Sequence, residues 1–200
     1  ARADARLAYQ ILEKLDLINL SVARSKLTGM SLDRVAASIA SFDFVYLAAL
    51  AKKHVHAPSV RPPNAPGSSA QGGGHVLEPV TGMHENVWVL DYKSLYPCLM
   101  RTFNIDPLTY VRSGAEHSDD IRTPTGAAFR RGDAILPNIL DELFRAREQA
   151  KRDSDEVASQ AIKILMNSFY GVLGTSGCRF HNTDIANSIT GLGRHFLLWS

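Results

Sequence analysis

Apolar residues recur at three- and four-residue spacing over most of this chain, which is the period of one face of an α-helix. Residues 4–55 show this pattern without an interrupting proline, and a cap signal at Ser31 divides them into two predicted helices. The pattern returns over 94–103, 136–152, 157–174 and 183–199. A polar turn, KRDSDE, joins the helices predicted over 136–152 and 157–174, so these two are expected to form an antiparallel hairpin.

Three segments depart from the helical pattern. Residues 57–75 are dominated by Pro, Gly and Ser, which indicates a loop or linker. Residues 86–91 (NVWVLD) are rich in Val and Trp and predict a buried β-strand that ends at Asp91. Residues 104–136 are punctuated by Pro and Gly and read as irregular, with Asn104-Ile105-Asp106 as an ordinary turn. Helices with a strand predict an α+β fold that is predominantly helical.

The composition is that of an ordinary globular protein. Of 200 residues, 45% are apolar and 21% are charged, and no apolar run is long enough for a membrane span. Two cysteines are too few for a disulfide framework, which favours a reducing cytoplasm. A net charge of +2 supports nucleic-acid binding only weakly. The first residues, ARADARLAYQ, lack a signal-peptide core, and we expect the chain to be a piece of a longer protein.

Cationic side chains gather on the predicted hairpin. Arg147 and Lys151 are spaced i, i+4 and share a helix face, and Lys163, Asn167 and Tyr170 share a face of the next helix. If both faces border the same space, their side chains could bind a polyphosphate, because Arg offers a planar fork of donors and Lys a point charge. The alternative is a solvated charged face. Lys163 and Asn167 stand among apolar residues, where burial without a partner is costly.

Asp91 ends the predicted strand and precedes a predicted helix. A carboxylate at this place is either a helix cap or a ligand for a cation. Phosphoryl transfer needs divalent cations held by such hard oxygen ligands, and the turn after a strand exposes N–H groups to phosphate. Taken alone, Asp91 fits both interpretations.

Four segments together resemble family B DNA polymerases. DYKSLYP at 91–97 matches their motif A (D-x-x-S-L-Y-P-S), and KILMNSFYG at 163–171 matches motif B (K-x-x-x-N-S-x-Y-G). RAREQAK at 145–151 is similar to the Arg and Lys of their fingers domain, and GGGHVLEP at 72–79 to a Gly-Gly segment that contacts template. The resemblance covers about 72–200 and is closest to the bacterial DNA polymerase II branch. Cys98 departs from the usual Ser of motif A.

The resemblance implies a role for each motif A residue. Asp91 would be a catalytic residue that holds two Mg²⁺ ions, and Tyr92 would offer its backbone carbonyl to a metal. Ser94 and Leu95 would present backbone N–H groups to the triphosphate of the incoming dNTP. Tyr96 would stack under its sugar and exclude a 2′-hydroxyl; the alternative is a core aromatic.

The hairpin and the glycine segment carry the other implied contacts. Lys163 would be catalytic as well as dNTP-binding, against the alternative of a snorkelling surface Lys. For Tyr170 and Gly171, the alternative to a contact with the nascent base pair is a role in helix packing. The implied dNTP ligands are Arg147, Lys151, Lys163 and Asn167, and the implied template or nascent-pair contacts are Tyr170, Gly171, Gly73 and Gly74.

The family resemblance also implies partners and domains. Primer–template DNA, dNTPs and a sliding clamp are the implied partners, without a membrane, in a bacterial cytoplasm and associated with the nucleoid. The family's third motif, D-T-D-S, does not occur in these 200 residues, so they are expected not to polymerise by themselves. Asp4 stands where the last metal ligand of a 3′–5′ exonuclease is expected; a helix N-terminal acid is the alternative. The predicted division is 1–56 exonuclease end and connection, 57–85 linker and template contact, 86–135 palm, 136–174 fingers and 175–200 return into the palm.

Two rival interpretations remain. A polymerase-like module without catalysis would bind DNA or act as a scaffold. A protein-primed or viral polymerase would usually carry an insertion between motifs A and B, for which the spacing from Asp91 to Lys163 leaves little room.

Overall fold

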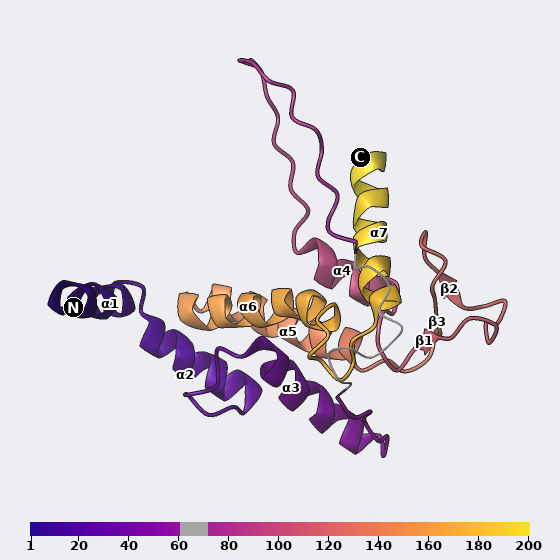
Figure 1. Cartoon of the computed structure of the whole chain (residues 1–200), viewed down its shortest axis with the longest axis horizontal. Helices are drawn as coiled ribbons and strands as arrows, with labels where there is room; N and C mark the ends of the chain where they lie inside the picture. Colours follow the sequence, from indigo (N-terminus) through magenta and orange to yellow (C-terminus); the bar gives the residue numbers. More distant parts are fainter. Residues whose placement is uncertain (61–71) are drawn as a thin grey trace.

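A computed structural model describes residues 1–60 and 72–200 of the chain (Figure 1). These residues form seven α-helices and three short strands. The helices are α1 (Arg2–Lys14), α2 (Leu17–Thr28), α3 (Ser38–Lys52), α4 (Leu95–Thr102), α5 (Leu136–Arg152), α6 (Glu156–Leu173) and α7 (Thr183–Trp199). The strands are β1 (Tyr110–Val111), β2 (Ile121–Arg122) and β3 (Ala128–Phe129), which pair antiparallel in the order β1-β3-β2.

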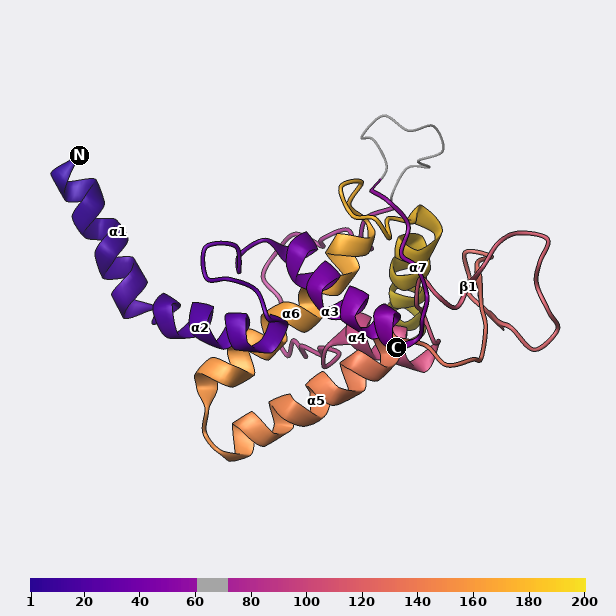
Figure 2. The ribbon, with the colours of Figure 1, turned by 90° about the horizontal axis from the view of Figure 1, so that it is seen from below.

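Helix α6 is the centre of the fold and contacts α2, α3, α4, α5 and α7. It runs antiparallel beside α5, as predicted, with α2 and α3 on one side and α4 and α7 on the other (Figures 1 and 2). Asp155 caps its first turn by accepting a hydrogen bond from the N–H of Ala158 at 2.8 Å. Its apolar residues at helical spacing are buried: Ala161, Ile162, Leu165, Met166, Phe169, Val172 and Leu173.

The N-terminal helices differ from their predicted boundaries. The helical pattern is broken at Asp16, whose left-handed backbone (φ 50°) separates α1 from α2. Helix α2 ends at Gly29, which also adopts the left-handed conformation (φ 79°) that favours glycine. The chain then turns, and α3 begins at Ser38 with Ala37 as its cap. The prediction of a helix start at Ser31 is therefore wrong, because a cap-type residue is equally common in turns.

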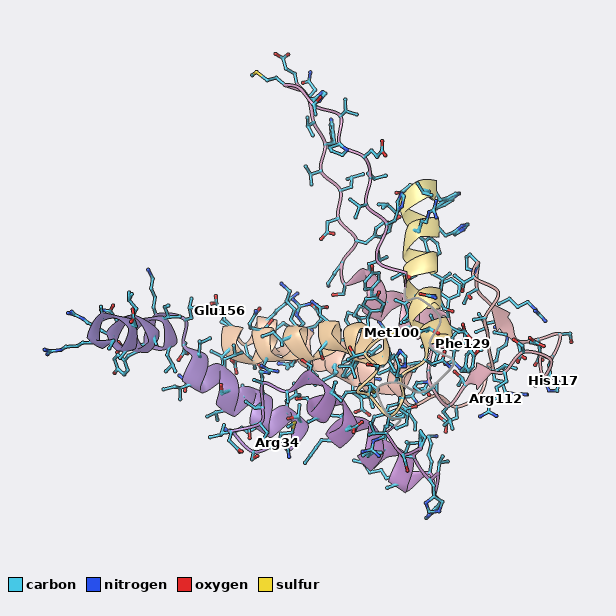
Figure 3. All side chains as sticks on the ribbon, viewed as in Figure 1. Arg34, Met100, Arg112, His117, Phe129 and Glu156 are labelled. Atoms are coloured by element: carbon cyan, nitrogen blue, oxygen red, sulfur yellow. The ribbon has the colours of Figure 1, made fainter. Side chains whose placement is uncertain are left out.

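The predicted buried strand over 86–91 is wrong. This segment belongs to an extended arm, residues 72–93, that leaves the helical body and returns to α4 (Figure 1). Its side chains point outward along both legs, and Trp88 and Leu90 are 87% and 86% exposed (Figure 3). A strand needs a neighbour to pair its N–H and C=O groups, and the described residues offer none along 86–91.

The α+β class is confirmed, but its strands come from elsewhere. The small sheet lies within residues 104–136, which were predicted to be irregular. Phe129 of the central strand β3 pairs with Tyr110 of β1 on one side and with Ile121 of β2 on the other. Each strand has two residues, so no alternation of apolar and polar positions could reveal it. Phe129 is fully buried and joins the sheet to the core near Met100 of α4 (Figure 3).

Asp106 does stand at a turn, since its backbone C=O accepts from the N–H of Thr109 at 3.2 Å, but the prediction missed the role of its carboxylate. Its side chain is fully buried, at 0% exposure. The carboxylate accepts hydrogen bonds from the hydroxyl of Tyr46 at 2.6 Å, from the N–H of Leu108 at 2.6 Å, and from the N–H groups of Ile135, at 3.0 Å, and Leu136. Three of the four donors come from α3 and from the start of α5, far from Asp106 in sequence, which is why the local pattern did not reveal them.

Candidate active site

Asp91 lies at the base of the arm, in the turn that leads into α4. Its side chain is exposed and has no hydrogen bond or ion pair with any residue that the structure describes. The N-cap of α4 is Ser94, three residues later, with a left-handed backbone (φ 53°). Asp91 therefore does not cap α4, and the first of the two interpretations of this acid is not supported. A solvent-facing carboxylate without a partner is chemically suited to bind a cation.

Tyr96 is the centre of a cluster that joins four elements. Its ring lies 4.7 Å from the ring of Tyr170 on α6, measured between centroids. A Cβ added at Gly74 of the arm would lie 3.0 Å from the Tyr96 hydroxyl, and one at Gly193 of α7 would lie 3.2 Å from its ring. Burial, and then the nearby Tyr170, raise the pKa of the Tyr96 phenol above its usual value. The structure thus brings Tyr96, Tyr170 and Gly74 together.

Both ends of the arm are tied to α7. The N–H of Gly72 donates to Oδ1 of Asn187 at 2.8 Å, and the hydroxyl of Tyr92 donates to the carbonyl of Phe196 at 3.4 Å. Gly73, predicted to contact template, has open space where a Cβ would stand. Its lack of a side chain is therefore not required by any neighbour among the described residues.

The turn of motif A is linked to the fingers-like hairpin by charge. Lys93 and Lys151 both bind the carboxylate of Glu148 on α5, at 3.0 Å and 3.3 Å. The hydrogen bonds from Lys93 and then Lys151 lower the pKa of Glu148. Cys98, in the place of the family's Ser, donates its thiol to the Lys93 carbonyl at 3.4 Å, so it braces the same turn. Lys151 therefore lies near motif A, and its predicted role as a dNTP ligand stays a prediction.

The remaining hairpin residues divide by exposure. Lys163, Asn167 and Gly171 lie on the exposed face of α6, so the concern about burying them among apolar residues does not apply. Their apolar neighbours point to the opposite face, as a period of 3.6 residues requires. Lys163 and Asn167 have no hydrogen-bond or ion-pair partner in the described part of the chain. Arg147 on α5 is half-buried, and its Nε is buried without a partner among the described residues.

Asp4 lies far from this cluster along the chain, in the first turn of α1. It is exposed and its carboxylate contacts the amino group of Ala1 at 3.0 Å. Over residues 1–60 and 72–200, no group of three or more His, Cys, Asp or Glu side chains is arranged to hold a metal ion. Its predicted role as an exonuclease ligand stays a prediction.

Several residues of the cluster were not predicted from the sequence. Asn187 and Gly193 stand on α7, which carried no recognised motif, and Lys93 occupies a position of motif A that the family pattern leaves open. Glu148 adjoins Arg147 inside RAREQAK. Its position three residues before Lys151 was the sequence signal for the ion pair between them.

A family model described as DNA polymerase family B matches residues 37–200. The chain belongs to DNA polymerase family B. The predicted resemblance is thereby confirmed, and the model covers motif A, the hairpin and motif B of this family B chain.

Individual relatives agree with the family. DNA polymerase II of Escherichia coli (strain K12) is 37% identical over 198 residues, covering 97% of this chain and 25% of that protein. A DNA polymerase of Archaeoglobus fulgidus is 31% identical over 211 residues, covering 98% of this chain and 26% of that protein. The family B DNA polymerase structure from Pyrobaculum calidifontis superposes with a TM-score of 0.74 at 26% identity, over 94% of this chain and 26% of that one.

The family B chain spans about a quarter of the length of these relatives. None of the helices that the structure describes has the length and apolar character to cross a membrane.

Proposed function

We propose that this chain is the part of a DNA-directed DNA polymerase that carries the motif A carboxylate and the dNTP-binding hairpin. The reaction is attack of a primer 3′-hydroxyl on the α-phosphate of a template-matched dNTP, with pyrophosphate leaving. The observation that carries the proposal is the placement of motif A, with its unpartnered Asp91, against the hairpin of motif B within a family B fold. The rival module without catalysis has no observation in its favour.

Among the described residues, Asp91 supplies one carboxylate that fits the implied Mg²⁺ ions. Asp91 is exposed and unpartnered, and Mg²⁺ is commonly held by one or two carboxylates together with substrate phosphates and water. Asp91 and the backbone carbonyl of Tyr92 would be the ligands from this chain. When bound, the two ions activate the attacking hydroxyl and neutralise charge on the phosphates. The predicted inactivity of residues 1–200 by themselves stays a prediction.

The start of α4 is suited to bind phosphate through its backbone. The first N–H groups of a helix have no partner within the helix, and the helix dipole is positive at this end. Ser94 and Leu95 stand at this position, and Ser94 has the left-handed backbone of a tight turn. These features support the proposed role of both N–H groups toward the triphosphate.

Cations on the hairpin would complete the triphosphate site. Lys163 and Asn167 are exposed and unpartnered in the described structure, while Lys151 is held by Glu148 and would exchange that carboxylate for phosphate. The guanidinium of Arg147 has a buried Nε that lacks an acceptor among the described residues, and a phosphate oxygen would supply one. The hairpin would bring these groups onto the dNTP as it closes.

The ring of Tyr96 is expected to select deoxynucleotides. It is fixed by Tyr170, Gly74 and Gly193, so it cannot easily move away from a 2′-hydroxyl. We expect Tyr96→Ala in the full-length polymerase to reduce discrimination against ribonucleotides by about 10- to 100-fold. The measurement is the ratio of kcat/KM for a dNTP and the matching rNTP. Tyr96→Phe keeps the ring and should keep the ratio; equal ratios for all three proteins would contradict the assignment.

The proposed polymerase activity is tested directly by primer extension. The full-length protein encoded by the uncut reading frame is incubated with a labelled primer–template, Mg²⁺ and four dNTPs. We expect template-matched extension that stops when the metal is chelated and resumes when Mg²⁺ is added back in excess. Tight binding of primer–template without extension would instead support the scaffold module. A sliding clamp, the exonuclease role of Asp4 and the predicted domain division, part of which lies in residues 61–71 outside the described structure, remain predictions.

A further inference from the structure

Helix α5 has no cap of its own. Its N-cap position is Ile135, which has no side chain able to accept a hydrogen bond, and Pro137 near its start has no N–H. The N–H groups of Ile135 and Leu136 both donate to Oδ2 of Asp106, about thirty residues earlier in the chain. A carboxylate at a helix N-terminus is favoured by the helix dipole as well as by these bonds. The N-terminus of α5 is thus capped by the side chain of Asp106, which is remote in sequence.

Asp106 is in turn fixed from a third element. Its other oxygen, Oδ1, accepts the hydroxyl of Tyr46 on α3 at 2.6 Å and the N–H of Leu108 at 2.6 Å. Tyr46 is itself 1% exposed and lies in an aromatic group with Phe42 and Phe180. Burial raises the pKa of the Asp106 carboxyl, and the hydrogen bonds from Leu136 and Tyr46 act in the opposite direction. Each carboxylate oxygen of Asp106 thus accepts two hydrogen bonds.

Neighbouring contacts strengthen the same junction. The side-chain amide of Asn104 donates to the carbonyls of Arg130, at 2.7 Å, and Gly132, at 3.0 Å, in the segment before α5. Lys53, at the end of α3, forms an ion pair with Asp133. The segment that begins the hairpin is thus attached to α3 and to the loop after α4. Towards its far end, α5 packs along α6 and is linked to motif A by the exposed ion pair of Glu148 with Lys93, which constrains it weakly.

We propose that Asp106 is a positioning residue that sets the angle of the hairpin and, through it, the affinity for dNTP. This inference rests on the proposed function. Arg147 lies eleven residues beyond Leu136 (147 − 136) on α5. At 1.5 Å per residue this is a lever of about 16 Å, so a tilt of about 5° at the base moves Arg147 by about 1.4 Å. Misplacement on this scale is enough to weaken a catalytic contact substantially.

Two variants of the full-length polymerase test the proposal. Tyr46→Phe removes only the hydroxyl donor. Asp106→Asn replaces one acceptor oxygen by an NH₂ group that cannot accept, so either the α5 N–H groups or the N–H of Leu108 loses its partner. At a temperature where all proteins are folded, we expect each to raise the dNTP KM by about 5-fold, with kcat and the primer–template Kd within about twofold. Amide hydrogen exchange at Ile135 and Leu136 should also become faster, which is a readout independent of activity.

A destabilising control separates positioning from mere stability. Ile189→Val shortens a fully buried side chain in α7, an element that gives Asp106 no hydrogen bond, and should lower Tm while leaving the dNTP KM unchanged. If Tyr46→Phe and Asp106→Asn behave like this control, with a lower Tm and an unchanged KM, the proposal is overturned. If Asp106→Asn does not fold, Tyr46→Phe decides alone. If the wild type extends no primer, the proposed function fails first, and hydrogen exchange then reports on the junction by itself.

Discussion

Asp91→Asn in the full-length polymerase is expected to lower kcat for primer extension by on the order of 10³-fold or more, because the lost charge is one that would hold both metal ions. The substitution keeps the size and shape of the side chain. Since Asp91 is exposed and makes no hydrogen bond in the described structure, Tm and the primer–template Kd should stay as in the wild type. Single-turnover extension over a range of Mg²⁺ concentrations measures the effect.

Glu85→Gln is the matched control for this loss. Glu85 is an exposed carboxylate on the same arm, six residues before Asp91, and its neutralisation removes one negative charge outside motif A. It should extend primers at the wild-type rate. Extension by Asp91→Asn within about tenfold of the wild type would mean that Asp91 holds no catalytic metal, since one removed electrostatic stabiliser normally costs about 10²–10³ in rate. The metal-binding interpretation of motif A would then be wrong.

The helical part of the fold was predictable because it rests on local patterns. Helices α5 and α6 have long amphipathic faces and a polar turn between them, and their predicted bounds agree closely with the structure. Asn182 caps α7 through its side chain, which accepts from the N–H of Asp184 at 2.8 Å, so this start was also visible in the sequence. Periodicity and caps are properties of neighbouring residues, which is why they could be read from the chain.

The arm and the small sheet were not predictable in the same way. Val and Trp at 86–91 favour a strand, yet a strand exists only where a second one pairs with it, and the sequence pattern does not say where that partner lies. The paired strands of this structure have two residues each and carry no pattern at all. The same holds for Asp106, whose importance depends on donors from α3 and α5.

The candidate site shows a similar division. The motifs singled out Asp91, Tyr96 and Tyr170, and the structure brings the two tyrosines into contact. The contacts that support them come from Asn187 and Gly193 on α7 and from the pairing of Lys93 with Glu148. A motif records the residues that meet substrate, while the residues that position them can stand anywhere the fold brings a side chain near.

Lys163→Ala is the second large effect that we expect. Lys163 is exposed and unpartnered in the described structure, so its charge is available to a triphosphate and its loss should not lower Tm. Removing one cation from a triphosphate site is expected to reduce kcat/KM for dNTP by about 10²-fold, mostly as a higher KM. Steady-state kinetics at saturating primer–template measure this, and Lys163→Arg should recover part of the loss because it keeps the charge.

Two comparisons make the Lys163 result decisive. Arg145→Ala removes an equally exposed cation from the neighbouring helix α5 and should leave the dNTP KM unchanged. Lys151→Ala should have a smaller effect than Lys163→Ala, because Lys151 must first leave Glu148, and that competing ion pair reduces its net contribution to phosphate binding. An unchanged KM in Lys163→Ala, or equal losses in all three variants, would show that the hairpin acts through its overall charge and that Lys163 is only a solvated surface residue.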